Sequence, residues 1–298
     1  MDLSTSSKSL NLLPLGIPTL IIADDPRLIA AARTTYAHCL AEAPMPNPAL
    51  ELTLRIGIAS SSGVSLDVAV EGSRLRLSGR ADGFADASCG KASATMSPDL
   101  ATDPAEFAEV TDTLLLFLLA RNGRTPVHAA AFLIGDLAVV LAGPSGSGKS
   151  TLALAAANRG FPILSDDTIF VQHDPAFAVW GLPRPMHLYP TDAPPGDHLT
   201  RMRNRKLKAA VPLAISAERA QRAVLVLLKR GSGLALSEIE PVDAVEELMR
   251  LEPGFDLLEK QSRRALVALA SDGAWRLELT DKPADAIDLL ATRFAAQN

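Results

Sequence analysis

The segment AVVLAGPSGSGKSTLALAAANRG, residues 138–160, decides how this chain is interpreted. Residues 138–142 are all apolar, as in a buried strand, and the glycine-rich run 143–150 fits the pattern G-x-x-x-x-G-K-[ST]. Residues 149–158 are rich in helix formers. A strand, a glycine-rich loop and a helix in this order predict a phosphate-binding loop, in which backbone N–H groups and a helix N-terminus surround an anion.

The residues of this loop predict a nucleoside triphosphate as the ligand. Lys149 is expected to reach the β- and γ-phosphates, and Ser150 is expected to give its hydroxyl to Mg²⁺. The predicted cofactors are therefore ATP and Mg²⁺. The residues expected to hold the nucleotide are Gly143, Pro144, Ser145, Gly146, Ser147, Gly148, Lys149, Ser150 and Thr151.

Two neighbouring carboxylates, Asp166 and Asp167, follow the predicted strand 161–164. A helix, a turn and a strand separate them from Lys149, so they would lie beside the phosphate loop, at the edge where open α/β sheets bind ligands. One carboxylate can hold Mg²⁺ while the other accepts a proton from an attacking hydroxyl. A solvent-exposed Asp-Asp turn is the alternative, and it is the interpretation that we prefer for Asp24-Asp25.

Predicted strands and helices alternate through the last two-thirds of the chain, which indicates an α/β core. Two apolar runs parted by Gly135-Asp136 predict adjacent strands that lead into the loop. The proline- and charge-rich stretch 181–208 is predicted to be a loop. Further strands are predicted at 168–172, 176–180, 223–229 and 234–240, and helices at 104–123, 242–251 and 284–297.

The first hundred residues have a different pattern, typical of a small α+β module. Strands are predicted at 19–22, 51–59, 66–80 (two strands around a turn at Glu71-Gly72) and 91–98, and a helix at 26–43. This region has no convincing catalytic constellation, so we expect it to bind a substrate or a partner. The predicted domains are a recognition domain over 1–100 and a catalytic domain over 101–298.

Composition excludes several classes of protein. The chain has 298 residues, of which 48% are hydrophobic, and a formal net charge of −5 from 29 basic and 34 acidic residues. It is too apolar to be disordered and too acidic to bind nucleic acid non-specifically. Two cysteines cannot form a disulfide framework. The strongest apolar run, residues 114–120, is far shorter than the roughly 20 residues of a membrane span, so we expect a cytoplasmic protein without membrane or nucleic-acid partners.

Residues 125–171 resemble the catalytic core of the HPr kinase/phosphorylase-type serine kinases. The members share a histidine on the strand before the phosphate loop, the loop itself, an Arg-Gly pair that ends the next helix, and a strand that ends in Asp-Asp. The corresponding residues of this chain are His128, the run from Gly143 to Ser150, Arg159-Gly160 and Asp166-Asp167.

This resemblance implies a P-loop kinase core of the HPr-kinase type, with a smaller N-terminal α+β domain. Carried over, the role of the base that activates a substrate serine falls on Asp166, with Lys149 as the phosphate-binding cation. His128 would lie near enough to Asp166 to tune it, and Asp167 would hold the metal together with Ser150. Catalytic domains of this family often form homo-oligomers, so a homo-oligomer is expected.

The sequence departs from the family at two positions, and it lacks the family's glycine-rich signature after the Asp-Asp strand and the later arginine-asparagine motif. Thr151 stands where the HPr-phosphorylating members usually carry an acidic residue, and Ala129 stands where they usually have glycine. The resemblance therefore predicts neither phosphorolysis nor HPr as the substrate. Residues 181–193 instead resemble HPr-kinase-related proteins, some of which phosphorylate a serine of a lasso-peptide precursor.

The predicted function is that of an ATP-dependent serine kinase acting on a peptide or small protein, which would be a partner bearing the acceptor serine. Two alternatives stay open, a kinase of a small hydroxylated metabolite and a nucleotide-sensing regulatory protein without kinase activity. The basic run 201–208 could supply a cation to the transferred phosphoryl group or be a solvated loop. Arg184 and His187 are weaker candidates for the same cleft.

Overall fold

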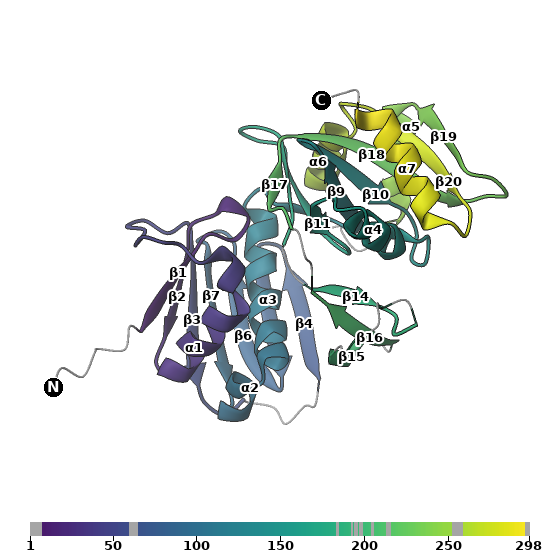
Figure 1. Ribbon diagram of the computed structural model, residues 1–298. Helices are drawn as coiled ribbons and strands as arrows, with labels where there is room; N and C mark the ends of the chain where they lie inside the picture. The colour runs from purple at the N-terminus through teal and green to yellow at the C-terminus, as the bar shows by residue number, and fades with distance from the viewer. Residues whose placement is uncertain are drawn as a thin grey trace. The chain divides into compact units, whose positions relative to one another are not determined.

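The computed structural model describes residues 8–59, 65–182, 185–191, 193, 196, 199–203, 206–212, 216–251 and 259–295. The chain divides into two compact units, Met1–Arg124 and Thr125–Asn298. Both units contain helices and sheets (Figure 1), so the predicted mixed α/β class is confirmed.

Within its described residues, the first unit contains a seven-stranded sheet in the order β1-β2-β3-β7-β6-β5-β4. Along β2 and β3 every second side chain is buried, because helices cover one face of the sheet and leave the other open. The strands are β1 (Ser9–Leu12), β2 (Thr19–Ala23), β3 (Leu50–Ile56), β4 (Leu66–Glu71), β5 (Arg74–Gly79), β6 (Ala81–Asp86) and β7 (Lys91–Met96). The helices are α1 (Pro26–Thr35), α2 (Pro98–Thr102) and α3 (Pro104–Arg121), with 3₁₀ turns at Pro14–Gly16 and Ala37–Cys39.

The boundary between the units lies at Arg124, later than the predicted boundary near residue 100. Helix α3 causes the difference, because it packs on β6 and β7 of the first sheet. Phe107, Val110 and Leu114 of α3 are fully buried. An apolar helix of this kind needs a sheet face to cover it, and the sheet of the first unit provides that face.

Helix α1 ends at Thr35, whereas the sequence predicts a helix as far as residue 43. The buried ring of Tyr36 follows, and its hydroxyl lies 2.8 Å from Thr111 Oγ1 and 2.9 Å from Asp112 Oδ1 on α3. Anchoring this tyrosine turns the chain out of the helix, and Leu40 then bridges to β1. Strands β1 and β6 are also absent from the sequence prediction.

The second unit is built around a six-stranded sheet, counted over the described residues, in the order β11-β9-β10-β18-β20-β19. Strands β10, β18 and β20 run parallel, and β9 is antiparallel to both β10 and β11. The carboxyl ends of β10, β11, β18 and β20 therefore lie at one edge of the sheet, together with the start of β9. The strands are β9 (Ala129–Ile134), β10 (Leu137–Ala142), β11 (Ile163–Ser165), β18 (Arg222–Arg230), β19 (Ala235–Ile239) and β20 (Ala274–Leu279).

Helices cover both faces of this sheet, which explains why every residue of β10 is buried. Val139 and Leu141 face a core shared with α4 and α7, and Val140 faces a second core shared with α5 and α6. Figure 1 shows α4 and α7 side by side over one face. The helices are α4 (Lys149–Asn158), α5 (Pro241–Leu251), α6 (Glu259–Leu269) and α7 (Pro283–Phe294).

Two smaller sheets complete the described part of the second unit. One has the order β17-β13-β12-β8 and consists of β8 (Thr125–Val127), β12 (Ile169–Gln172), β13 (Ala178–Trp180) and β17 (Arg219–Ala220). The other has the order β14-β16-β15 and consists of β14 (Met186–Leu188), β15 (Leu199–Arg203) and β16 (Lys206–Val211).

The sheet of β14, β15 and β16 lies where the sequence predicts a loop over 181–208, so that prediction is wrong. Three residues of this sheet join the core beside α4, namely Met186, Leu188 and Val211. Their burial stabilises short strands, and the prolines and charged residues around them give no strand pattern in the sequence. Helix α6 and strand β20 are likewise absent from the sequence prediction.

Across the described residues, no helix has both the length and the apolar character needed to span a membrane.

Candidate active site

The predicted phosphate-binding loop joins the end of β10 to the start of α4. Gly148 precedes α4 with a φ of 105°, a left-handed conformation that glycine adopts without strain. At Gly143 a Cβ atom would lie 3.2 Å from the carbonyl oxygen of Leu228 on the neighbouring β18. Glycine at these two positions lets the chain turn sharply out of the sheet and brings the N-terminus of α4, with its free N–H groups, to the sheet edge.

Lys149 folds back over this loop. Its Nζ donates to the carbonyl oxygens of Gly143 at 2.7 Å and Pro144 at 3.3 Å, and the residue is only 6% exposed. The Oγ of Ser147 is buried and has no hydrogen-bond partner within the described part of the chain. A phosphate would give the Lys149 ammonium a charged acceptor in addition to these carbonyls, and it would give the Ser147 hydroxyl an acceptor where the described residues supply none.

The polyphosphate of a nucleotide therefore fits the residues of the loop. It would accept hydrogen bonds from the N–H groups at the start of α4, from Lys149 and from Ser147. The positive end of the α4 dipole favours the same charge.

Asp166 and Asp167 lie at the same edge, directly after β11. Asp166 is 8% exposed, and its carbonyl oxygen accepts a hydrogen bond of 3.3 Å from Ser150 Oγ. The turn is held by Ser165, whose Oγ accepts from the backbone N–H groups of Asp167 at 3.4 Å and Thr168 at 3.2 Å. The structure thus brings the first turn of α4 and the carboxylate pair together, as their spacing in the sequence predicts.

His128 immediately precedes β9 and reaches the same carboxylate pair. Its Nδ1 lies 2.9 Å from the backbone oxygen of Asp167 and 3.4 Å from Asp167 Oδ1. Both side chains are close to half-exposed. The imidazole therefore lies beside the second carboxylate, Asp167, and contacts both its backbone and its side chain.

The donor set at this edge fits Mg²⁺ bound together with phosphates. No cluster of three or more His, Cys, Asp or Glu side chains suited to a metal occurs in the described residues. Mg²⁺ does not need such a cage, because it usually keeps several waters and takes one or two protein oxygens plus substrate phosphates. Ser150 and Asp167 are the residues that would supply those oxygens.

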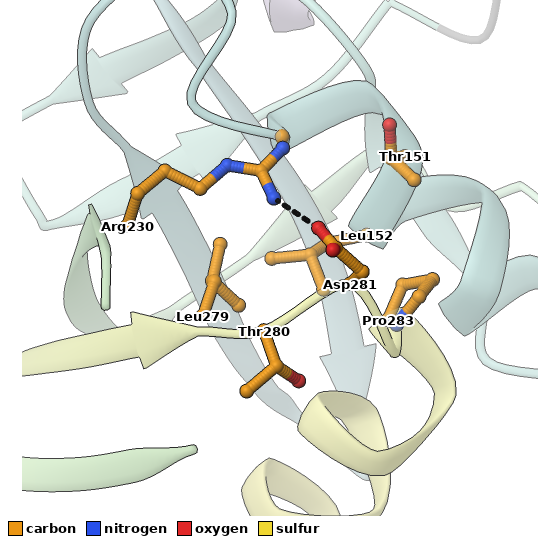
Figure 2. Close-up of a pocket in the computed structure, with 8 residues that line it drawn as sticks. Thr151, Leu152, Arg230, Leu279, Thr280, Asp281 and Pro283 are labelled. Atoms are coloured by element: carbon orange, nitrogen blue, oxygen red, sulfur yellow. Dashed lines mark hydrogen bonds and ion pairs between the residues drawn. The ribbon is translucent and has the colours of Figure 1, made fainter. Parts of the chain in front are cut away.

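Two further charged residues, Arg230 and Asp281, lie at the same edge, and sequence reasoning missed both. Arg230 is the last residue of β18, and Asp281 follows β20. Their side chains form an ion pair of 3.3 Å that closes one side of a pocket beside the phosphate loop (Figure 2). The alternation of AWRLEL over β20 is the signal that could have revealed this part of the edge.

The remaining candidates from the sequence contribute less. Arg184 lies outside the described residues, and His187 belongs to β14 without a described side chain. The basic run 201–208 contributes backbone to the hairpin of β15 and β16, with Arg203 opposite Lys206. Its basic side chains also lie outside the described part, so its predicted role toward phosphate stays a prediction.

Comparison with known proteins adds a likeness to solved structures. No family model matches this sequence, and no curated protein matches it either. Among solved structures, the Hpr(Ser) kinase/phosphatase from Coxiella burnetii is similar with 13% sequence identity and a TM-score of 0.32. The match covers 58% of this chain and 98% of that one. At this level of similarity, neither the fold nor the activity of that enzyme carries over to this chain.

Proposed function

We propose that this protein is an ATP-dependent kinase that transfers the γ-phosphoryl group to a hydroxyl of a peptide or small protein. The observation that supports it most is the pairing of a phosphate-binding loop with a buried carboxylate. Ser150 of the loop donates a hydrogen bond to the backbone carbonyl of Asp166, which holds this residue next to the loop where phosphates would bind. Binding a nucleotide needs only the loop, whereas activating an alcohol needs a base.

The loop residues bind and orient the donor. Lys149 would exchange the carbonyls of Gly143 and Pro144 for phosphate oxygens and oppose the charge that develops during transfer. The N–H groups at the start of α4 hold the phosphates in one position, so much of the rate gain comes from orientation. When bound, Mg²⁺ would supply further charge neutralisation between the phosphates, held by Ser150 and Asp167.

Asp166 would act on the acceptor. Its carboxylate takes the proton of the acceptor hydroxyl while the oxygen forms its bond to the γ-phosphorus and the bond from the γ-phosphorus to the bridging oxygen of ATP breaks. ADP leaves with the electrons of that bond. Burial of Asp166 keeps water from competing for its hydrogen bonds. His128 would position Asp167 through their contact and leave the proton transfer to Asp166.

A serine in a peptide is the acceptor that we propose, because residues 181–193 resemble the segment of peptide-phosphorylating relatives. A small hydroxylated metabolite would meet the same machinery, and a nucleotide sensor would use the loop without the base. The full-length protein should therefore be incubated with γ-labelled ATP and separate pools of peptides and metabolites, with mass-spectrometric detection of products. Phosphoserine in the peptide pool supports the proposal. Label in metabolites alone, or nucleotide binding without any product, would overturn it in favour of the corresponding alternative.

A further inference from the structure

A small pocket adjoins the phosphate-binding loop on the side away from Asp166. Its volume is about 130 Å³, and its lining includes Thr151, Leu152, Arg230, Leu279, Asp281 and Pro283. Figure 2 shows Arg230 extending above Leu279 toward Asp281, with Leu152 and Pro283 close to Asp281. Pockets for whole drug-sized ligands usually hold about 300–1,000 Å³, so this one suits a single ring system or sugar with the remainder of the ligand outside it.

The order of the strands places this pocket and Asp166 on opposite sides of the loop. From β10, strand β11 with Asp166 lies two positions away in one direction, and β20 with Asp281 lies two positions away in the other. At about 4.8 Å per strand, each lies roughly 10 Å from the loop. A triphosphate that crosses the loop would therefore point its γ-phosphate toward one of these residues and its nucleoside toward the other.

The lining has the chemistry of a nucleoside site. Leu152, Leu279 and Pro283 offer apolar surface to the flat faces of a base. A carboxylate such as Asp281 can accept hydrogen bonds from ribose hydroxyls. Arg230 lies close to the N-terminus of α4, since its Nη2 is 3.9 Å from the position of a Cβ on Gly148. That is where the free N–H groups of the helix already favour an anion.

The ion pair of Arg230 and Asp281 can open at little cost. The two side chains are 58% and 102% exposed, and exposed pairs contribute little to stability. Each partner would find a better one in a nucleotide, because Arg230 could bond a phosphate and Asp281 a sugar hydroxyl.

We propose that this pocket binds the nucleoside half of the donor, with Asp281 on the ribose and Arg230 on the phosphate nearest to it. The inference rests on the proposed nucleotide-dependent function and adds the orientation in which the nucleotide lies across the loop. The base lies against Leu279, the phosphates cross the loop, and the γ-phosphoryl group points toward Asp166. Asp281 then selects ribonucleotides over analogues that lack the sugar hydroxyls.

The test compares three ligands, ATP, 2′,3′-dideoxy-ATP and inorganic tripolyphosphate, by calorimetry on the full chain. Wild-type protein should bind ATP about tenfold more tightly than the dideoxy analogue, the value of one hydrogen bond to a charged group. In Asp281→Asn this preference should shrink severalfold, because the neutral amide oxygen of asparagine accepts a weaker hydrogen bond than a carboxylate, and tripolyphosphate should bind at least as tightly as to the wild type.

Asp136→Asn is a matched control. Asp136 pairs with Arg222 at the same 3.3 Å, and Arg222 begins the strand that Arg230 ends. Both pairs are exposed, so neither substitution should unfold the protein. The control should keep the wild-type preference for ATP, because its pair lies at the opposite edge of the sheet.

A photoreactive 8-azido-ATP gives an independent readout, and its label should appear in the tryptic peptide 277–293. The inference is wrong if Asp281→Asn keeps the preference for ATP, if the wild type has none, or if the label falls on residues near β11. In those cases tripolyphosphate still binds, and the assignment of the loop to phosphate binding remains valid. If the wild type binds neither ATP nor tripolyphosphate, the proposed function fails and the inference with it.

Discussion

At the scale of single residues, Lys149 is a nearly buried cation in the loop that we propose binds phosphate. Its ammonium is nearly buried and is held by two backbone carbonyls of the loop. Burying a charge is unfavourable unless its partners compensate fully, and a phosphate would be a better partner than a neutral carbonyl.

Lys149→Met should therefore separate stability from binding. We expect the melting temperature to stay the same or rise, because methionine fills a similar volume without a buried charge. Binding of ATP and tripolyphosphate should weaken by about 10- to 100-fold. Thermal unfolding and calorimetry on the same preparation check both effects. Unchanged affinity for both ligands would show that Lys149 does not contact phosphate.

The residues of the site differ in how far the sequence could reveal them. The loop 143–150 and Asp166 are predictable, since the chemistry of each is local and their spacing spans one helix and one strand. Arg230 and Asp281 are not, because they become neighbours only through the parallel pairing of β18 with β20. A single sequence gives the strands of an α/β sheet more readily than their order.

At the scale of elements, the strand–loop–helix unit is held by contacts at the far end of α4. Arg159, at the C-cap of this helix, donates two hydrogen bonds to Asp288 of α7, at 2.9 and 2.6 Å. Hydrogen bonds from the Arg159 side chain hold the pKa of Asp288 below its ordinary value of 3.8. This bidentate pair links the helix of the phosphate loop to the helix that follows β20.

The Arg159–Asp288 pair predicts a specific sensitivity of stability to acid. A carboxylate whose pKa is lowered by folding stabilises the folded state above its unfolded pKa, and that contribution disappears as the pH falls through the folded pKa. Between pH 6 and pH 3, the melting temperature of the wild type should therefore fall further than that of Asp288→Asn, which has no carboxylate to titrate at this position. Equal losses in the two proteins would show that the pair does not contribute. Because the pair is exposed, the difference at pH 7 should be small.

Helix α3 and strand β20 show why parts of the fold escape prediction. The apolar stretch of α3 predicts a buried helix but does not say which sheet it covers, and it covers the first one. Strand β20 has only six residues, and its neighbours in the sheet are distant in sequence. In both cases contacts distant in sequence decide which sheet and which neighbours the element joins, and the local pattern does not contain that information.

At the scale of the whole molecule, the division at Arg124 predicts how the chain tolerates truncation. A protein of residues 125–298 should express in soluble form and bind tripolyphosphate, since the loop and both cores of its sheet lie within the second unit. A protein of residues 101–298 should aggregate, because it keeps α3 without β6 and β7 and exposes Phe107, Val110 and Leu114. Size-exclusion chromatography of the two distinguishes these outcomes. Equal behaviour would contradict the boundary at Arg124.

The net charge of −5 belongs to the whole chain and does not describe the charged groups beside the loop. A chain with this net charge is not expected to bind polyanions in general, yet Lys149, Arg230 and the N-terminus of α4 lie together beside the phosphate-binding loop, at one sheet edge. Asp166 and Asp167 lie at the same edge, so the site combines a region that attracts phosphate with carboxylates suited to a proton and a metal.

The most direct test of phosphoryl transfer at this edge is single-turnover transfer from ATP by wild type and Asp166→Asn, with ATP affinity measured on the same samples. The acceptor is the one identified in the phosphorylation screen. The substitution should keep ATP affinity within about twofold, because the loop contacts are intact, and should slow transfer by about 10²- to 10⁴-fold, the usual contribution of a general base. Transfer by Asp166→Asn at the wild-type rate would contradict the account.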